Sequence, residues 1–206
     1  MHYANTYLDY LYTSEGDVTP KFVKETIEYT INVGHDVTSI ELFGEPVDKS
    51  MTVTTIFEGV TKTIAKGEPS LGEYNLKTGN NVVYIKITSV SGVSRTYIVN
   101  VNRAKDTANY LLTLEAKVGS IKYELDPTFD SEVKSYTVTV PAGTPNITLS
   151  GTISTNATVT GLGTYDLQPG NNVITIKVKS ESGDENEYTV TVYRELSTNN
   201  FLSRKP

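Results

Sequence analysis

Histidine is the side chain that exchanges a proton most readily near neutral pH, and the 206-residue sequence contains two, His2 and His35. It has no cysteine to act as a nucleophile or as a thiolate ligand. Neither a Ser-His-Asp set nor a metal-ligand cluster can be assembled from this inventory. The glycine-containing segment 67–72 lacks the spacing of a phosphate-binding loop. We therefore predict no catalytic, cofactor-binding or metal-binding residues and no enzyme activity.

Carboxylates are the second group that could do chemistry, because calcium ions bind through oxygen ligands. They gather at residues 181–187 and at Asp126, Asp130 and Glu132, and single ones lie in two short polar segments, 104–108 and 195–199. None of these groups has the ordered spacing of a calcium-binding loop. We expect them to be solvated turns, with a weak cation site as the alternative.

Tyrosine is the third candidate, because an exposed aromatic ring can stack against a sugar or a partner surface. Tyr84 and Tyr193 fall on outward positions of predicted strands, and Tyr10, Tyr12 and Tyr123 lie near the first strands of each half. Scattered exposed aromatic residues are also ordinary surface, and the sequence has no tryptophan. The ligand-binding residues therefore stay unknown at this level.

An internal repeat indicates which elements position these residues. The segment 74–103 recurs as 165–194 at an offset of 91, with half of its positions identical, and the segment 8–11 recurs as 111–114. Such self-similarity indicates a duplicated module. We predict module 1 over 1–104 with an inserted hairpin near 54–70, module 2 over 105–195, and in 196–206 a linker and the start of a truncated third module.

Each copy is predicted to be a β-sandwich. Val83, Ile85 and Ile87 alternate with more polar residues, the period of a strand with one buried face. A Ser-Gly turn at 91–92 joins this strand to the next, and Gly-Asn-Asn at 79–81 is expected to turn the chain into it. The pattern predicts an all-β chain with about seven strands in each copy, arranged as a Greek-key, immunoglobulin-like sandwich.

The repeated tyrosines and arginines are expected to support this fold. Tyr29, Tyr97, Tyr136 and Tyr188 alternate in register with core valine and isoleucine, which predicts that they are buried. Arg103 and Arg194 end the last strand of each copy. At the module junction each cation could reach a carboxylate, and we expect a capping or interface role for it in preference to ligand binding.

Charge and hydropathy exclude two classes of partner. The net charge is −6 and the isoelectric point is about 5.0, so no basic face for nucleic acid is predicted. No apolar run reaches the roughly 18 to 20 residues that would span a bilayer, so we expect no membrane span in this chain. The absence of cysteine does not decide between compartments.

The order of these motifs resembles the bacterial cadherin-like β-sandwich domain family over nearly all of both copies. The resemblance rests on Leu-x-x-Leu, Tyr-x-Val-x-Val, Gly-Asn-Asn and the closing Tyr-x-Val-x-Val-x-Arg, seen in full at 188–194. It implies two tandem cadherin-like sandwiches, an extracellular location at a bacterial cell surface, and a carbohydrate-binding role.

Three functions remain open. The first is a non-catalytic spacer or adhesion unit of a modular surface or secreted protein. The second is a carbohydrate-binding accessory module beside a glycoside hydrolase or wall-binding domain, with polysaccharide as the partner. The third is adhesion to another surface protein through an exposed sheet edge, which a charged or proline-blocked edge would weaken. Neighbouring modules of the same chain are further expected partners.

Overall fold

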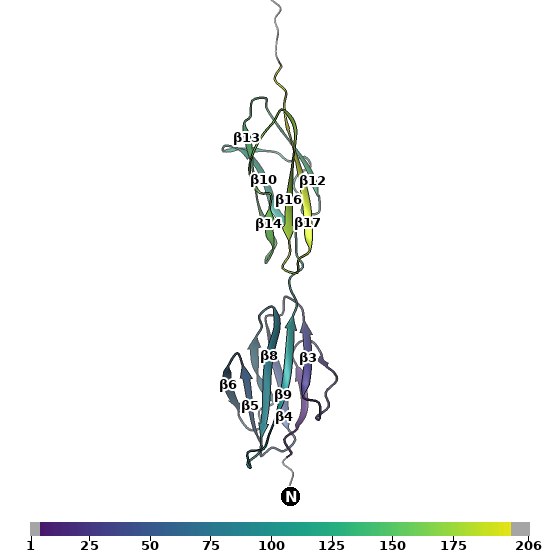
Figure 1. Ribbon diagram of the computed structural model, residues 1–206, viewed down its shortest axis with the longest axis vertical. Coiled ribbons are helices and arrows are strands. Elements are labelled where there is room, and N and C mark those ends of the chain that lie inside the picture. The colour runs from purple at the N-terminus through teal and green to yellow at the C-terminus, as the bar shows by residue number, and fades with distance from the viewer. Residues whose placement is uncertain (1–4, 199–206) are drawn as a thin grey trace, which may run out of the picture. The chain divides into compact units, whose positions relative to one another are not determined.

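The computed structural model describes residues 5–198, in which all regular structure is β-strand (Figure 1). The contacts between Cα atoms divide the chain into two compact units, residues 1–105 and 106–206, which we call module 1 and module 2. Each unit has its own apolar core between two sheets. The predicted fold class, an all-β chain with two tandem sandwiches, is confirmed.

Module 1 packs a three-stranded sheet against a six-stranded one. The small sheet has the order β1 (Leu8–Thr13), β4 (Ser39–Pro46), β7 (Ser70–Asn75). The large sheet has the order β2 (Val18–Thr19), β3 (Glu28–Val33), β9 (Ser94–Arg103), β8 (Gly79–Thr88), β5 (Thr52–Phe57), β6 (Val60–Ile64). All pairs are antiparallel except β3 with β9.

Module 2 repeats this plan with two four-stranded sheets. One has the order β11 (Ile121–Tyr123), β10 (Leu111–Val118), β13 (Asn146–Ile153), β15 (Gly163–Asp166). The other has the order β12 (Ser135–Val140), β17 (Glu185–Arg194), β16 (Gly170–Lys179), β14 (Thr158–Thr160). Its single parallel pair, β12 with β17, corresponds to β3 with β9 of module 1.

Alternation of side chains builds both cores as predicted. Val83, Ile85 and Ile87 of β8 are fully buried, and the residues between them face outward. The tyrosines predicted to be core residues are buried as well: Tyr29, Tyr97, Tyr136 and Tyr188. Removing a buried aromatic side chain costs about 3–5 kcal/mol, so these positions are occupied for stability.

The inserted segment of module 1 adds one strand to the large sheet. β5 pairs with β8, and β6 pairs only with β5, so β6 is an edge strand. Glu58 and Gly59 connect β5 to β6 with positive φ at both residues, the conformation of a two-residue type I′ turn. The predicted tight turn at Gly92, with a φ of 85°, is confirmed.

Two further sequence predictions concern the end of the chain and membrane-spanning segments. The proposed start of a third module falls almost wholly within 199–206, outside the described range. Within residues 5–198 no helix is long and apolar enough to cross a membrane.

Candidate functional site

Two buried tyrosine hydroxyls tie loops to the cores at equivalent positions of the two modules. The Tyr97 hydroxyl accepts a hydrogen bond from the Leu8 N–H (3.1 Å) and donates one to the Lys24 carbonyl (2.6 Å). Tyr188 repeats both bonds in module 2, at 3.2 and 2.8 Å. Burial raises the pKa of Tyr97, so its phenol stays protonated. Because both copies use the group identically, it serves the fold.

The Gly-Asn-Asn motif also serves the fold, though differently from its prediction as a backbone turn. Gly79 has a φ of 90°, but Asn81 already lies in strand β8 and acts through its side chain. Its amide accepts a hydrogen bond from the Lys77 N–H (2.9 Å) and donates to the carbonyls of Lys77 (2.8 Å) and Gly79 (3.0 Å). A further bond reaches the Val101 carbonyl (3.2 Å). Asn172 makes the same four bonds in module 2.

The two arginines that end the modules cap backbone carbonyls. Arg103 donates from Nε (2.9 Å) and Nη2 (2.5 Å) to the His35 carbonyl, and from Nη1 to the Leu76 carbonyl (3.1 Å). Arg194 donates from Nη1 to the equivalent Leu167 carbonyl at 2.6 Å. His35 is exposed in a turn, and His2 lies outside the described residues. The expected capping role matches these contacts, but the partners are backbone carbonyls and not the carboxylate that was expected.

The acidic groups lie at turns and cap them. Asp106 is buried at the start of module 2, where its N–H donates to Glu181 Oε2 (3.0 Å) and its Oδ1 accepts from the Ala108 N–H (2.9 Å). Asp130 accepts a bond from the Glu132 N–H (2.9 Å) within its own turn. Across residues 5–198 no three histidine, aspartate or glutamate side chains are grouped so that they could hold a metal ion.

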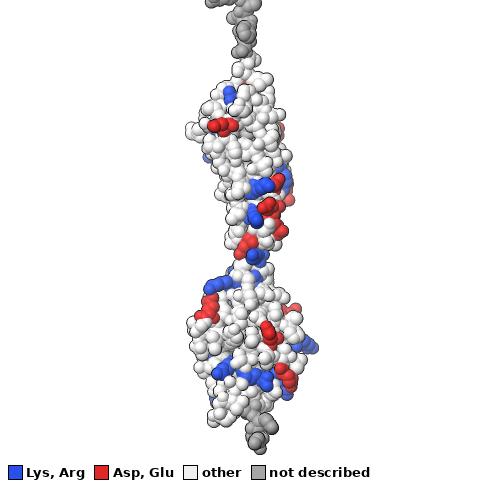
Figure 2. Space-filling view, viewed as in Figure 1, with Lys and Arg blue, Asp and Glu red and all other residues white. Residues whose placement is uncertain are grey.

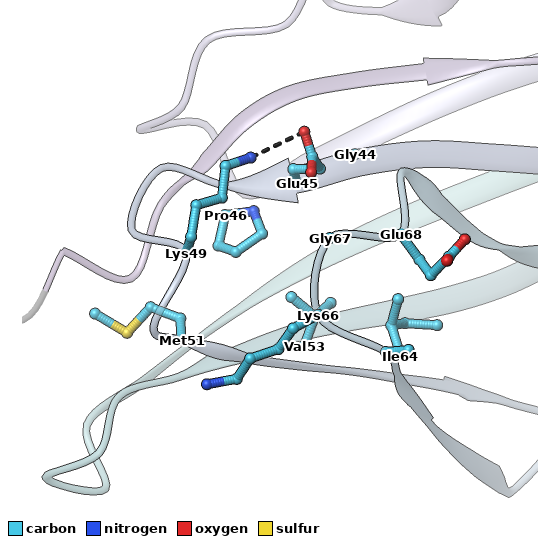
Figure 3. Close-up of a pocket in the computed structure, with 11 residues that line it drawn as sticks. Gly44, Glu45, Pro46, Lys49, Met51, Val53, Ile64, Lys66, Gly67 and Glu68 are labelled. Atoms are coloured by element: carbon cyan, nitrogen blue, oxygen red, sulfur yellow. Dashed lines mark ion pairs between the residues drawn. The ribbon is translucent and has the colours of Figure 1, made fainter.

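The hollow drawn in Figure 3 is too small for an organic ligand. It lies in module 1 beside the inserted strands, above Met51, Val53 and Ile64, with the ion pair of Lys49 and Glu45 (2.9 Å) on its rim. Its volume is about 20 Å³, which is room for roughly one water molecule. Larger hollows, such as those of about 350 Å³ beside Tyr12 and about 610 Å³ beside Arg95, are open to solvent, so a sugar or peptide would bind at an open surface.

One open surface of module 1 carries a cluster of aromatic rings, which we call the aromatic face: Tyr10 and Tyr12 of β1 and Phe43 of β4. The ring centroids of Tyr12 and Phe43 are 4.8 Å apart with an angle of 16° between their planes. Tyr10 and Tyr12 are 5.6 Å apart at 21°. Tyr12 is 51% exposed. Tyr12 and Phe43 face each other in the β1–β4 register, so the small sheet itself sets their positions.

Carboxylates held by hydroxyl groups surround this aromatic face. The Tyr10 hydroxyl donates to Glu45 Oε2 (3.2 Å), Ser70 Oγ donates to Glu41 Oε1 (2.5 Å), and Ser39 Oγ donates to Glu73 Oε1 (3.0 Å). Hydrogen bonds from Lys49 and Tyr10 lower the pKa of Glu45, whereas burial and the bond to Glu45 raise the pKa of Tyr10. At neutral pH the carboxylate is therefore charged and the phenol is its donor.

Among the described residues of module 2, the equivalent face has no aromatic ring. The repeat offsets place Thr113, Glu115 and Ser150 where module 1 has Tyr10, Tyr12 and Phe43. Thr113 hydrogen-bonds to Thr152 (2.8 Å) across the strands. Glu115 pairs with two lysines at 2.7 and 3.2 Å. Since this sandwich forms with a polar face, the fold does not require the aromatic rings of module 1.

The other outward tyrosines do not form such a cluster. Tyr84 is 40% exposed on β8, opposite the half-buried Ile56 and Ile98 on the neighbouring strands, and Tyr193 is 38% exposed on β17. Tyr123 does not face outward, because it packs partly buried against the module 2 core. Tyr123, a candidate because it lies near the first strand of its module, is therefore not an exposed ring.

Sequence reasoning found Tyr10 and Tyr12 but not Phe43 or the surrounding glutamates. The alternation along β4 could have identified Phe43. Ile40 and Leu42 are buried, and Glu41 and Phe43 occupy the alternate positions of the strand. That pattern would have placed Phe43 outward with the glutamates. The pairing of β4 with β1 could not be read from it, because pairing depends on the whole sheet.

The comparisons with known proteins follow the two-module division. A family model described as "Cadherin-like beta sandwich domain" matches residues 8–104 and 111–195. A protein of Evansella cellulosilytica, provisionally described as a membrane protein, is 30% identical over 132 residues, which are 62% of this chain and 18% of that protein. The chain therefore spans less than a fifth of this relative.

Two solved structures show weaker likeness. The extracellular domain of a provisionally assigned hybrid two-component system of B. thetaiotaomicron has 18% identity and a TM-score of 0.34, covering 47% of this chain and 15% of that one. A Bacteroides ovatus protein of a mixed-linkage glucan utilisation locus, solved with a mixed-linkage heptasaccharide, has 15% identity and a TM-score of 0.29, covering 89% and 72%.

Proposed function

We propose that this chain, which belongs to the cadherin-like beta sandwich domain family, is a non-catalytic part of an extracellular protein. In this proposal module 1 carries a contact surface, the aromatic face, and module 2 acts as a spacer. The relative that is provisionally described as a membrane protein supports a surface location. The capping and tethering roles of the repeated polar residues support the absence of catalysis, because those residues serve the two cores.

The observation that carries the proposal is the difference between two copies of one fold. Module 1 exposes Tyr12 between Tyr10 and Phe43, and module 2 has a threonine, a glutamate and a serine at the matching positions. Exposed clusters of apolar rings mark interaction surfaces more often than single exposed residues do. The polar face of module 2 needs no role beyond folding. The aromatic face of module 1 is not needed for folding, so it requires another role.

Adhesion by strand addition is less well supported than binding at this face. The inserted edge strand β6 carries Lys62 on the same side as the buried Ile64, and an inward-pointing charge is a common device against edge pairing. At the opposite edge of the same sheet, β2 is two residues long and Pro20 follows it. Both edges of the large sheet therefore resist an added strand.

Carbohydrate binding is the second candidate, and the aromatic face is also what favours it. A ring such as Tyr12 offers an apolar surface, and the flanking carboxylates could accept hydrogen bonds from sugar hydroxyls. Phe43 lies against Tyr12 at 4.8 Å, so part of the Tyr12 ring is covered. The three rings therefore offer less stacking surface to a sugar than three separate rings would.

Retention on natural surfaces tests the contact role. Labelled chain is incubated with intact bacterial cells, insoluble cellulose and chitin, beside a variant in which Tyr12→Thr and Phe43→Ser copy the polar character of module 2. Tyr193→Asn, which replaces an exposed tyrosine by its module 1 counterpart, is the matched control. We expect retention that falls with the double substitution alone. Equal retention of all three proteins, or none on any surface, would overturn the contact role.

The spacer role and the location have their own tests. Small-angle X-ray scattering of the whole chain should give a maximum dimension close to the summed lengths of two modules. A dimension close to that of one collapsed body would contradict the spacer role. Antibody labelling of intact cells that express the parent protein should reach this chain without permeabilisation, and labelling only after lysis would contradict a surface location.

A further inference from the structure

The carboxylates around the aromatic face differ from those of module 2 in how their charge is balanced. Within residues 5–198, Glu41 and Glu73 form no ion pair, and each is oriented by a serine hydroxyl. Glu45, by contrast, forms an ion pair with Lys49 (2.9 Å). The equivalent face of module 2 has a glutamate, Glu115, that is neutralised by two lysines.

Two other outward glutamates of module 2 also form ion pairs. Glu187 pairs with Lys177 at 2.6 Å and Glu185 with Lys179 at 3.8 Å on strands β16 and β17. Figure 2 shows adjoining red and blue groups on one face of module 2. The small sheet of module 1 therefore differs from its equivalent in module 2, where the outward Glu115 is paired with lysines.

Aromatic rings of this chain already accept cations. The guanidinium carbon of Arg95 lies 4.2 Å from the ring centroid of Tyr7, and Lys134 Nζ lies 4.3 Å from that of Tyr188. A tyrosine face attracts a cation through the negative charge of its π-system. On the aromatic face the rings lie beside negatively charged carboxylates. The negative π-systems and the carboxylates therefore both attract a positively charged group to this surface.

From this charge complementarity we propose that the aromatic face docks a basic polypeptide segment, with lysine or arginine side chains that lie against the uncovered part of the Tyr12 ring and reach Glu41 and Glu73. The inference rests on the proposed contact role of module 1 and names its partner. An open hollow of about 350 Å³ beside Tyr12 is bordered by Asp17, Lys21 and Phe22. Phe22 gives the aliphatic part of such a side chain a further apolar contact, and Asp17 balances the charge of Lys21.

An octalysine peptide tests the inference by isothermal titration calorimetry on the whole chain at low ionic strength. The double substitution Glu41→Gln and Glu73→Gln should weaken binding about tenfold, because two uncompensated charges and their steering are lost. Its control, Glu115→Gln with Glu187→Gln, removes the same charge from lysine-paired positions and should change affinity less than about twofold. Tyr12→Thr should weaken binding about threefold and Tyr193→Asn should not.

If the two double glutamine substitutions weakened octalysine binding equally, the peptide would be attracted to the acidic chain in general. That result would overturn the inference. A fall in binding of cellohexaose or chitohexaose on Tyr12→Thr, with octalysine unaffected by every variant, would also overturn it and leave the contact role of the aromatic face intact. Retention on cells that is unchanged by Tyr12→Thr and Phe43→Ser would remove the contact role itself.

Discussion

Replacing Asn81 by alanine removes four hydrogen bonds that close the loop before strand β8. One backbone N–H and the carbonyls of Lys77, Gly79 and Val101 lose this partner in a site where Asn81 is 6% exposed. A typical hydrogen bond contributes about 0.5–1.5 kcal/mol net, and three of these bonds share one amide group, so we expect a loss of about 2 kcal/mol. The neighbouring Asn80 makes one exposed bond at 3.3 Å, so Asn80→Ala should cost less than about 0.5 kcal/mol.

Differential scanning calorimetry of the whole chain measures both effects. A loss of 2 kcal/mol should lower the melting temperature of a domain of this size by about 8–16 °C. Asn81→Ala should shift the transition of module 1 alone, and Asn172→Ala should shift that of module 2 alone by a similar amount. Asn80→Ala and Asn81→Ala variants that melt at the same temperature would refute the assignment, and a shift of both transitions by one substitution would refute the independence of the modules.

Four further outcomes are expected from the same structure. Tyr97→Phe deletes a buried hydroxyl with two backbone partners and should lower the free energy of unfolding by about 1–3 kcal/mol in urea titrations. Burial raises the pKa of Tyr74, so the unfolded phenol ionises first and stability should fall as pH rises above about 10; Tyr74→Phe should flatten that slope in alkaline melts. Gly161→Ala places a Cβ 2.1 Å from a carbonyl oxygen, whereas the Cβ of Gly143→Ala, at a similar φ, meets no atom within 4 Å. In melting experiments the first substitution should lower the free energy of unfolding by about 1–3 kcal/mol more than the second. Lys62→Val unprotects the β6 edge and should produce dimers in analytical ultracentrifugation, and a monomer would contradict the protective role.

The repeat and the two-residue alternation carried most of the fold prediction, because both are local signals. Val83, Ile85 and Ile87 show the buried face of a strand without reference to its neighbours. The partners of that strand are a property of the whole sheet, so the sequence did not reveal that β9 pairs in parallel with β3. Asn81 was misjudged for a related reason, since a polar residue in a Gly-Asn-Asn run indicates a turn and its bonds across the hairpin are set by tertiary structure.

The candidate site was predictable only in part. Outward parity identified Tyr84 and Tyr193, yet neither belongs to a cluster, and the cluster forms where Tyr12 of β1 meets Phe43 of β4. Those two residues are 31 positions apart in the sequence (43 − 12), and only their pairing in the small sheet joins them.

Moving the aromatic face from module 1 to module 2 tests the central claim most directly. The whole chain is prepared with Tyr10→Thr, Tyr12→Thr and Phe43→Ser in module 1, and separately with Thr113→Tyr, Glu115→Tyr and Ser150→Phe added in module 2. Both proteins are first shown to be folded by circular dichroism. We predict that retention on the bacterial surface is lost in the first protein and at least partly restored in the second. A first protein that is retained like the original chain would contradict the claim that the aromatic face is the contact surface.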